Sequence, residues 1–165
     1  MTFELMKFTG SLVQKLAVNE ILKCNDLTIN YGLALSYEQA IELTETRTYS
    51  LKTSGRIEFG GGVIKKIIDE FCDSPYISMH NYNNTLHELI EMFYYYKNET
   101  LDLISDDELI HFMHKTYDGV CQGSLELLSG RELANMALNL RSGLAPDHSE
   151  EGNLDEDEED EYGEY

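Results

Sequence analysis

The apolar residues of this chain recur at helical spacing, and this pattern limits its possible folds more than any other feature. It is clearest from Val63 to Phe71, where apolar residues follow at i, i+1, i+4, i+5 and i+8. The residues on the opposite side are charged: Lys65, Lys66, Asp69 and Glu70. The sequence therefore predicts an amphipathic helix here. We expect it to end at Ser74-Pro75, because a residue before proline avoids the helical conformation.

Five other segments show the same period and should also be helical: residues 12–24, 37–54, 81–98, 106–118 and 130–142. Three of them are preceded by a serine with Gln or Glu three residues later, which is the pattern of a capping box. These serines are Ser36, Ser105 and Ser129. No convincing strand is present, since the alternation at Arg56–Phe59 lasts only four residues and predicts a short extended link. The chain is thus expected to be all-α, an irregular bundle of about six helices.

The charge divides the chain into two parts. There are 12 Lys+Arg against 31 Asp+Glu, a net charge of −19. Residues 146–165 contain 11 acidic residues and no Lys or Arg. We expect one helical domain over 1–145 and a disordered acidic tail over 146–165, because the tail has too little apolar surface to offset the entropy of ordering.

Composition excludes several partners and compartments. The negative charge is the wrong sign for binding a nucleic-acid backbone, so no direct nucleic-acid binding is expected. No apolar stretch approaches the roughly 18 residues of a membrane span, and the first residues do not resemble a secretory signal. The cysteines, Cys24, Cys72 and Cys121, are three in number and widely spaced, which favours reduced thiols and a cytoplasmic location.

A glycine-rich segment is the first candidate site. Gly60, Gly61 and Gly62 precede a helix whose first turn carries Lys65 and Lys66. Backbone N–H groups and two ammonium groups in this arrangement suit a phosphate or a carboxylate. The spacing fits neither a Walker A loop nor a dinucleotide fingerprint. The alternative is a tight backbone crossing between two helices.

A second candidate is a metal site formed by imidazoles and carboxylates: His87, Glu91, Asp107, His111 and His114. His87 and Glu91 lie on the polar face of the helix expected over 81–98, and the other three lie on the polar face of the helix expected over 106–118. Histidine and carboxylate ligands together suit Zn²⁺ or Fe²⁺. The alternative is that all five are surface residues facing water. No cofactor is expected otherwise, and a divalent metal is the one possibility left open.

A third candidate is a protein interface. The run Tyr94, Tyr95 and Tyr96 spans too much of a helical turn for every ring to face the core, so some should reach a partner or a second copy. Arg131, near an expected helix start, could serve a partner carboxylate. The alternatives are rings shared among helices of the core and an internal ion pair for Arg131.

Several blocks of sequence together resemble a family: Gly55–Gly62, Glu70–Tyr76, His87–Thr100, Asp106–Ile110 and Asp118–Arg131. They are similar to a small cytosolic family of unknown function from clostridia and related Firmicutes, over roughly residues 20–141. The resemblance implies a bacterial, cytoplasmic protein and no known activity or site residue.

These observations favour a non-enzymatic helical module for protein interaction or regulation, acting on a partner protein or by self-association. The alternative is a metal-binding protein or metal-dependent enzyme that uses the His and carboxylate cluster. A weaker alternative is binding of a phosphate or nucleotide at Gly60–Lys66.

Overall fold

The computed structural model describes residues 3–143, with side chains from residue 12 onward. Its helices are α1 (Phe3–Lys23), α2 (Asn25–Thr28), η1 (Ile29–Tyr31), α3 (Tyr37–Ser54), α4 (Gly62–Phe71), α5 (Tyr82–Glu99), α6 (Asp106–Asp118), α7 (Leu125–Leu127), η2 (Leu128–Leu133) and α8 (Ala134–Arg141). Six have eight or more residues, and no strand occurs within 3–143. The prediction of an all-α bundle of about six helices is confirmed. The predicted acidic tail lies outside the described residues.

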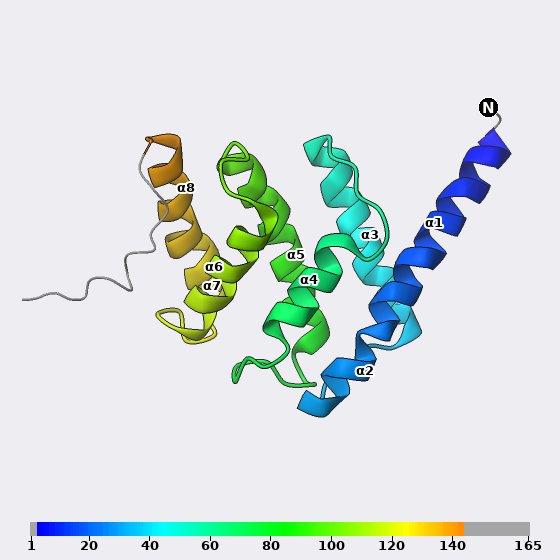
Figure 1. Ribbon diagram of the computed structural model, residues 1–165, viewed down its shortest axis with the longest axis horizontal. Coiled ribbons are helices and arrows are strands. Elements are labelled where there is room, and N and C mark those ends of the chain that lie inside the picture. The colour runs from blue at the N-terminus through cyan, green and yellow to red at the C-terminus, as the bar shows by residue number, and fades with distance from the viewer. Residues whose placement is uncertain (1–2, 144–165) are drawn as a thin grey trace, which may run out of the picture.

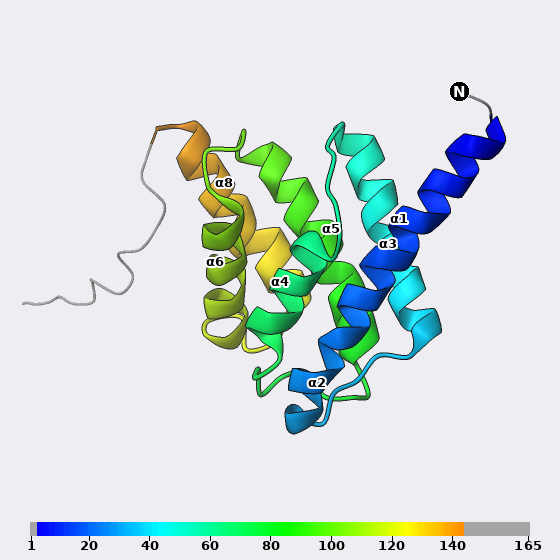
Figure 2. The same ribbon diagram turned by 45° about the vertical axis from the view of Figure 1, so that its right-hand side comes forward.

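The long helices form two layers (Figures 1 and 2). α1, α4 and α6 lie side by side in one layer, and α3, α5 and α8 lie in the other. Helices pair across the layers, α1 with α3, α4 with α5, and α6 with η2, which continues into α8. The links 55–61 and 100–105 begin at the same end of the bundle, where α3 and α5 end.

The core lies between the two layers, and α4 contributes its whole apolar face to it. Val63, Ile64, Ile67, Ile68 and Phe71 are all at most 2% exposed. They join the apolar faces of the other helices in one contiguous cluster. The amphipathic helix predicted from Val63 is therefore confirmed, and burial of this face is the main force that holds α4 in place.

Two of the three predicted capping boxes are present. Ser36 accepts a hydrogen bond from the Gln39 backbone N–H, and the Gln39 side chain accepts one from the Ser36 N–H. Ser105 and Glu108 make the same reciprocal pair at the start of α6. Each box satisfies two N–H groups that the first helical turn leaves unpaired.

The third predicted box, at Ser129, is wrong. The helix begins earlier, where the Ser124 hydroxyl accepts from the Leu127 N–H, and runs on through a wide π-helical turn into α8. Leu128 and Leu133 are five residues apart and both fully buried, a spacing that needs this wider turn. Ser129 is instead an interior helical residue.

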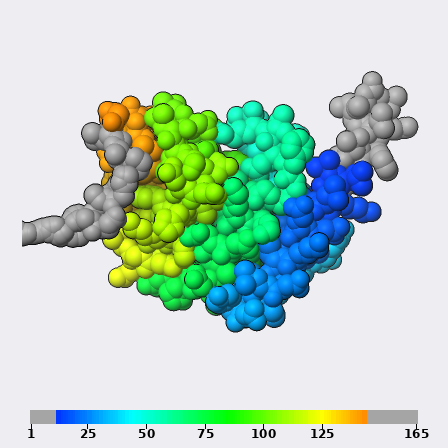
Figure 3. Space-filling view, in the orientation of Figure 1, coloured from blue at the N-terminus to red at the C-terminus, as the bar shows by residue number. Residues whose placement is uncertain are grey.

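The first helix is longer than the apolar period indicated. α1 begins at Phe3, and its N-terminal half extends away from the bundle (Figures 1 and 2). Leu12, Val13 and Leu16 are exposed, whereas Ala17 and Val18 are buried. Figure 3 shows α1 at the edge of the molecule, next to α3. Within residues 3–143, no helix is long and apolar enough to cross a membrane.

Candidate functional site

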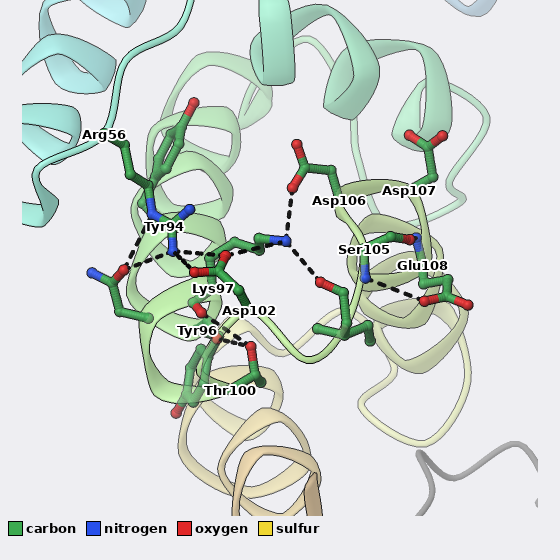
Figure 4. A network of polar contacts seen from close by, with 12 residues as sticks. Arg56, Tyr94, Tyr96, Lys97, Thr100, Asp102, Ser105, Asp106, Asp107 and Glu108 are labelled. Atoms are coloured by element: carbon green, nitrogen blue, oxygen red, sulfur yellow. Dashed lines mark hydrogen bonds and ion pairs between the residues drawn. The ribbon is translucent and has the colours of Figure 1, made fainter. Parts of the chain in front are cut away.

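Two loops at one end of the bundle are joined by Arg56 (Figure 4). Its guanidinium donates hydrogen bonds to Asn98 Oδ1, at 3.2 Å from Nε and 2.9 Å from Nη2. It also forms an ion pair of 2.9 Å with the Asp102 carboxylate. Arg56 belongs to the link 55–61, Asn98 to the end of α5, and Asp102 to the link 100–105. The guanidinium therefore holds the two links next to each other.

Lys97 lies beneath these loops as a buried cation (Figure 4). Its side chain is 8% exposed, and Nζ donates to the Ile104 carbonyl at 2.7 Å. Asp106 lies 2.9 Å from Nζ and Asp102 lies 3.6 Å from it. A buried ammonium needs partners of this kind, because an unpaired charge is costly to remove from water. Lys97 thereby holds the link 100–105 through Asp102 and Ile104, and holds the start of α6 through Asp106.

The same link contains two consecutive residues in the left-handed backbone region. Leu101 has φ 57° and Asp102 has φ 59°. Aspartate tolerates this region, but a leucine there is strained by about 1–2 kcal/mol. The strained leucine is not held by packing, because its side chain is 63% exposed. The surrounding polar contacts therefore impose a backbone that directs an apolar side chain into solvent.

Replacing Leu101 with glycine is expected to raise the free energy of unfolding by about 0.5–1 kcal/mol, because glycine adopts positive φ without strain and little packing is lost. Chemical denaturation measures this change. Leu103→Gly is the matched control: Leu103 is similarly exposed but lacks positive φ, so its replacement should destabilise the chain. A loss of stability in Leu101→Gly as large as in the control would contradict the assigned strain.

Four large apolar side chains of these two loops face solvent. Ile57 is 81% exposed, Phe59 75%, Leu101 63% and Leu103 59%. No other described Ile, Leu, Val, Phe or Met side chain is more exposed than the first three. Alternation along the extended segment explains Ile57 and Phe59, since they point outward while Glu58 between them points inward. The three most exposed of these side chains thus lie on the loops whose backbone polar contacts fix.

Glu58 is the centre of a second polar network, underneath the link 55–61. Its carboxylate accepts from the Tyr94 hydroxyl at 2.6 Å, the Val63 N–H at 3.2 Å and Arg47 Nη1 at 3.4 Å. Arg47 is buried, and its Nε has no hydrogen-bond partner among the described residues. Burial, together with the adjacent Glu58 carboxylate, raises the pKa of Tyr94 far above its ordinary value. This network borders an open hollow of about 550 Å³ between α1 and α3.

The start of α4 already holds two carboxylates of this chain. The Gly61 N–H donates to Glu20 of α1 at 2.5 Å, and the Val63 N–H donates to Glu58. A Cβ at Gly60 would lie 2.7 Å from the Glu20 carboxylate, and one at Gly62 would collide with that of Glu58. The glycines thus permit a close crossing, which was the alternative to an external anion site. Lys65 and Lys66 point to Asp69 and Asp107 instead, at 2.7 and 2.9 Å.

The five residues predicted to bind a metal do not come together. His87 contacts Thr46 of α3 at 2.8 Å, and Asp107 pairs with Lys66. His111 and His114 both approach Glu70 of α4, at 3.3 and 2.8 Å. Among the described residues, no group of three or more His, Cys, Asp or Glu side chains is arranged to hold a metal ion. The residues on one helical face were predicted, but their neighbours on other helices were not.

His114 instead forms part of the α4–α6 contact. Its Nδ1 faces Glu70, and its Nε2 lies 2.9 Å from Asp118, although this second contact lacks the alignment of a hydrogen bond. The ring also packs on Phe71 with centroids 5.0 Å apart. Ser74 donates to the other oxygen of Asp118 at 2.6 Å. These contacts are internal and join two helices.

The tyrosine run divides between core and surface. Tyr94 and Tyr96 are buried, and the Tyr96 hydroxyl donates to the Ser129 carbonyl at 2.5 Å, so neither ring is presented to a partner. Tyr95 is exposed, and its role at an interface stays a prediction. Arg131 lies inside the last helix rather than at its start, and pairs with Glu132 at 2.7 Å. The internal ion pair considered as its alternative is therefore present.

Buried cysteine thiols and tyrosine hydroxyls should make the fold sensitive to alkali. Burial raises the pKa of the Cys24 thiol from 9.0 to about 11, and raises those of Cys72 and Cys121. Burial also raises the pKa of four tyrosines: Tyr82, Tyr94, Tyr96 and Tyr117. The unfolded chain therefore loses these protons at lower pH than the folded chain does.

The stability contributed by these groups is complete below their ordinary pKa values and is lost as the pH rises above them. We expect the free energy of unfolding to fall from about pH 9 upward, with cooperative unfolding near pH 10–11. Urea titrations at successive pH values measure the fall. Tyrosinate absorbance should rise first from exposed tyrosines such as Tyr49 and Tyr95, and then from the four buried tyrosines together with loss of helical circular dichroism. Complete ionisation of all tyrosines before unfolding would contradict the assigned burial.

The sequence interpretation missed the residues that organise this end of the bundle: Arg47, Glu58, Lys97 and the exposed apolar residues of the two links. A signal was present for two of them. Lys97 follows Phe93 by four residues, and Arg47 follows Leu43 by four, so each cation lies on the buried stripe of its helix. A charged residue on an apolar stripe indicates a buried partner.

Comparison with known proteins gives a family. Residues 20–146 match the family described as a family of unknown function, DUF6323. The chain belongs to this family. No curated protein and no solved structure matches the chain. The match includes both links, the Lys97 network and the Glu58 network, whereas the first part of α1 precedes it.

Proposed function

We propose that this protein is a non-enzymatic helical module that binds a partner protein through the loop end, defined as the exposed side chains of Ile57, Phe59, Leu101 and Leu103. The observation that carries the proposal is their exposure on loops that the ion pairs of Arg56 and Lys97 hold in place. Apolar side chains on a rigid support lose little entropy on binding, so most of their desolvation favours association.

The arrangement of helices supports the same conclusion. Helix pairs stacked in two layers are also the construction of α-solenoids, whose common role is to present surfaces to other proteins. This second support is an analogy of fold. A cytoplasmic, bacterial setting, as the family resemblance implies, belongs to the same proposal.

Site-specific photo-crosslinking in the native host tests the proposal. A photoreactive phenylalanine analogue is placed at Phe59 or Leu103, and at the control positions Ile29 and Val120, which have similar exposure in η1 and in the link after α6. We expect one protein to be crosslinked only from the first pair. Its purified form should bind the wild-type chain at least about tenfold more tightly than Ile57→Ser/Leu103→Ser. Equal crosslinking from all four positions would refute the proposal that the loop end is the binding surface.

We further propose that the protein acts without a bound cofactor, since the candidate ligands for a metal and for an anion contact one another or other residues of the chain. Native mass spectrometry of untagged protein from its host is expected to give the mass of the polypeptide alone or of a protein complex. A stoichiometric mass surplus of a metal ion or a nucleotide would restore the alternatives at His114 or at Gly61.

A further inference from the structure

We infer that the partner bound at the loop end is a basic protein segment, in which apolar residues are flanked by Lys or Arg. This inference rests on the proposed function and specifies the chemistry of its partner. Two features of the molecule support it: the distribution of charge around the four apolar side chains and the net charge of the chain.

In each ion pair that borders the loop end, the carboxylate is more exposed than the cation. The Arg56 side chain is 25% exposed and that of its partner Asp102 is 56% exposed. The Lys66 side chain is 50% exposed and that of its partner Asp107 is 80% exposed, whereas Lys97 is only 8% exposed. Asp106, at 42%, is also accessible. A partner approaching this surface therefore meets apolar groups bordered by carboxylates that are each more exposed than the cation they pair with.

The net charge of −19 acts in the same direction over a longer range. Opposite charge on the partner accelerates encounter, and like charge at close range opposes it. A second copy of this chain carries the same net charge of −19, so the two copies repel each other. A basic partner is therefore favoured over self-association, which the sequence had left open as an alternative.

Selection from a phage library of random peptides of about 16 residues tests this inference while the partner is still unidentified. The full chain is the target, and Ile57→Ser/Leu103→Ser is used for counter-selection, so that only peptides that need the loop end remain. Both residues are exposed, and equal unfolding midpoints confirm that the variant is folded. Ile29→Ser/Val120→Ser is the matched control and should retain binding.

We expect the retained peptides to contain more Lys and Arg than the starting library, next to apolar residues. Their affinity should fall at least about fivefold between roughly 50 and 300 mM NaCl. Asp107→Asn should weaken binding about threefold, because it removes the most exposed of the bordering carboxylates.

Retained peptides of neutral or acidic composition would overturn the inference and leave the proposed function intact. Failure to retain any peptide would also overturn it, and the crosslinking experiment would then decide the proposed function separately. A dimer in sedimentation velocity that Ile57→Ser/Leu103→Ser abolishes would identify a second copy as the occupant, against the inference.

Discussion

Replacing Glu58 with alanine is expected to lower the free energy of unfolding by about 3–5 kcal/mol, a large part of the total for a domain of this size. The change removes the acceptor for the Tyr94 hydroxyl, for the Val63 N–H and for Arg47. The guanidinium of Arg47 is then buried without a counter-charge. A single buried cation that loses its partner accounts for most of the expected loss.

Urea denaturation of Glu58→Ala measures the effect, with Glu45→Ala as control. Both side chains border the hollow between α1 and α3, but Glu45 is exposed, whereas Glu58 pairs with the buried Arg47. Replacement of Glu45 should change stability by less than about 0.5 kcal/mol. Arg47→Met combined with Glu58→Ala should recover part of the loss, because it removes the stranded charge. Absence of recovery would show that Arg47 is solvated in the single variant.

The helices were largely predictable because their signals are local. The apolar period of α4 and the capping boxes at Ser36 and Ser105 each depend on residues within one or two turns, and the structure has all three. The box at Ser129 has the same local signature but is absent, because burial of Leu128 and Leu133 extends the helix through it. Tertiary burial outweighs a cap of about 1 kcal/mol.

The candidate site was less predictable because its contacts join residues far apart in the sequence. Glu20 reaches Gly61, and Arg56 reaches Asp102. The spacing of residues within a helix identifies a shared face, as it did for His111 and His114. It gives no information on which helix that face meets, and so the carboxylate that both approach, Glu70, was missed.

Exposed apolar residues were missed for a different reason. Alternation in the segment at Ile57 and Phe59 suggests that the apolar side chains turn inward, but here Glu58 does so. Hydrophobic patterns predict burial, and they fail where a surface is kept apolar for another purpose. The disagreement between pattern and structure lies at the loop end, which we propose as the surface that contacts a partner.

Lys97→Met is expected to lower the free energy of unfolding by about 2–4 kcal/mol and to release the link 100–105. Methionine retains most of the apolar stem of lysine, so the loss of stability measures the contribution of the ammonium group. Without it the Ile104 carbonyl loses its donor, and Asp102 and Asp106 lose a shared cation. These carboxylates reach water, which keeps the expected loss below that for Glu58→Ala.

Two measurements separate loss of stability from loss of the loop. Hydrogen exchange should quicken at the backbone N–H groups of Leu101, Asp102 and Leu103, which are hydrogen-bonded in the wild-type chain. Lys66→Met is the control, because Lys66 also pairs with an aspartate of α6 but is half exposed. This replacement should lower the free energy of unfolding by less than about 0.5 kcal/mol.

If the loop end binds the partner, Lys97→Met should weaken binding without altering any contacting side chain, since the loop must then be ordered at the moment of association. Unchanged exchange and unchanged affinity would show that Lys97 stabilises the bundle without organising the loop end.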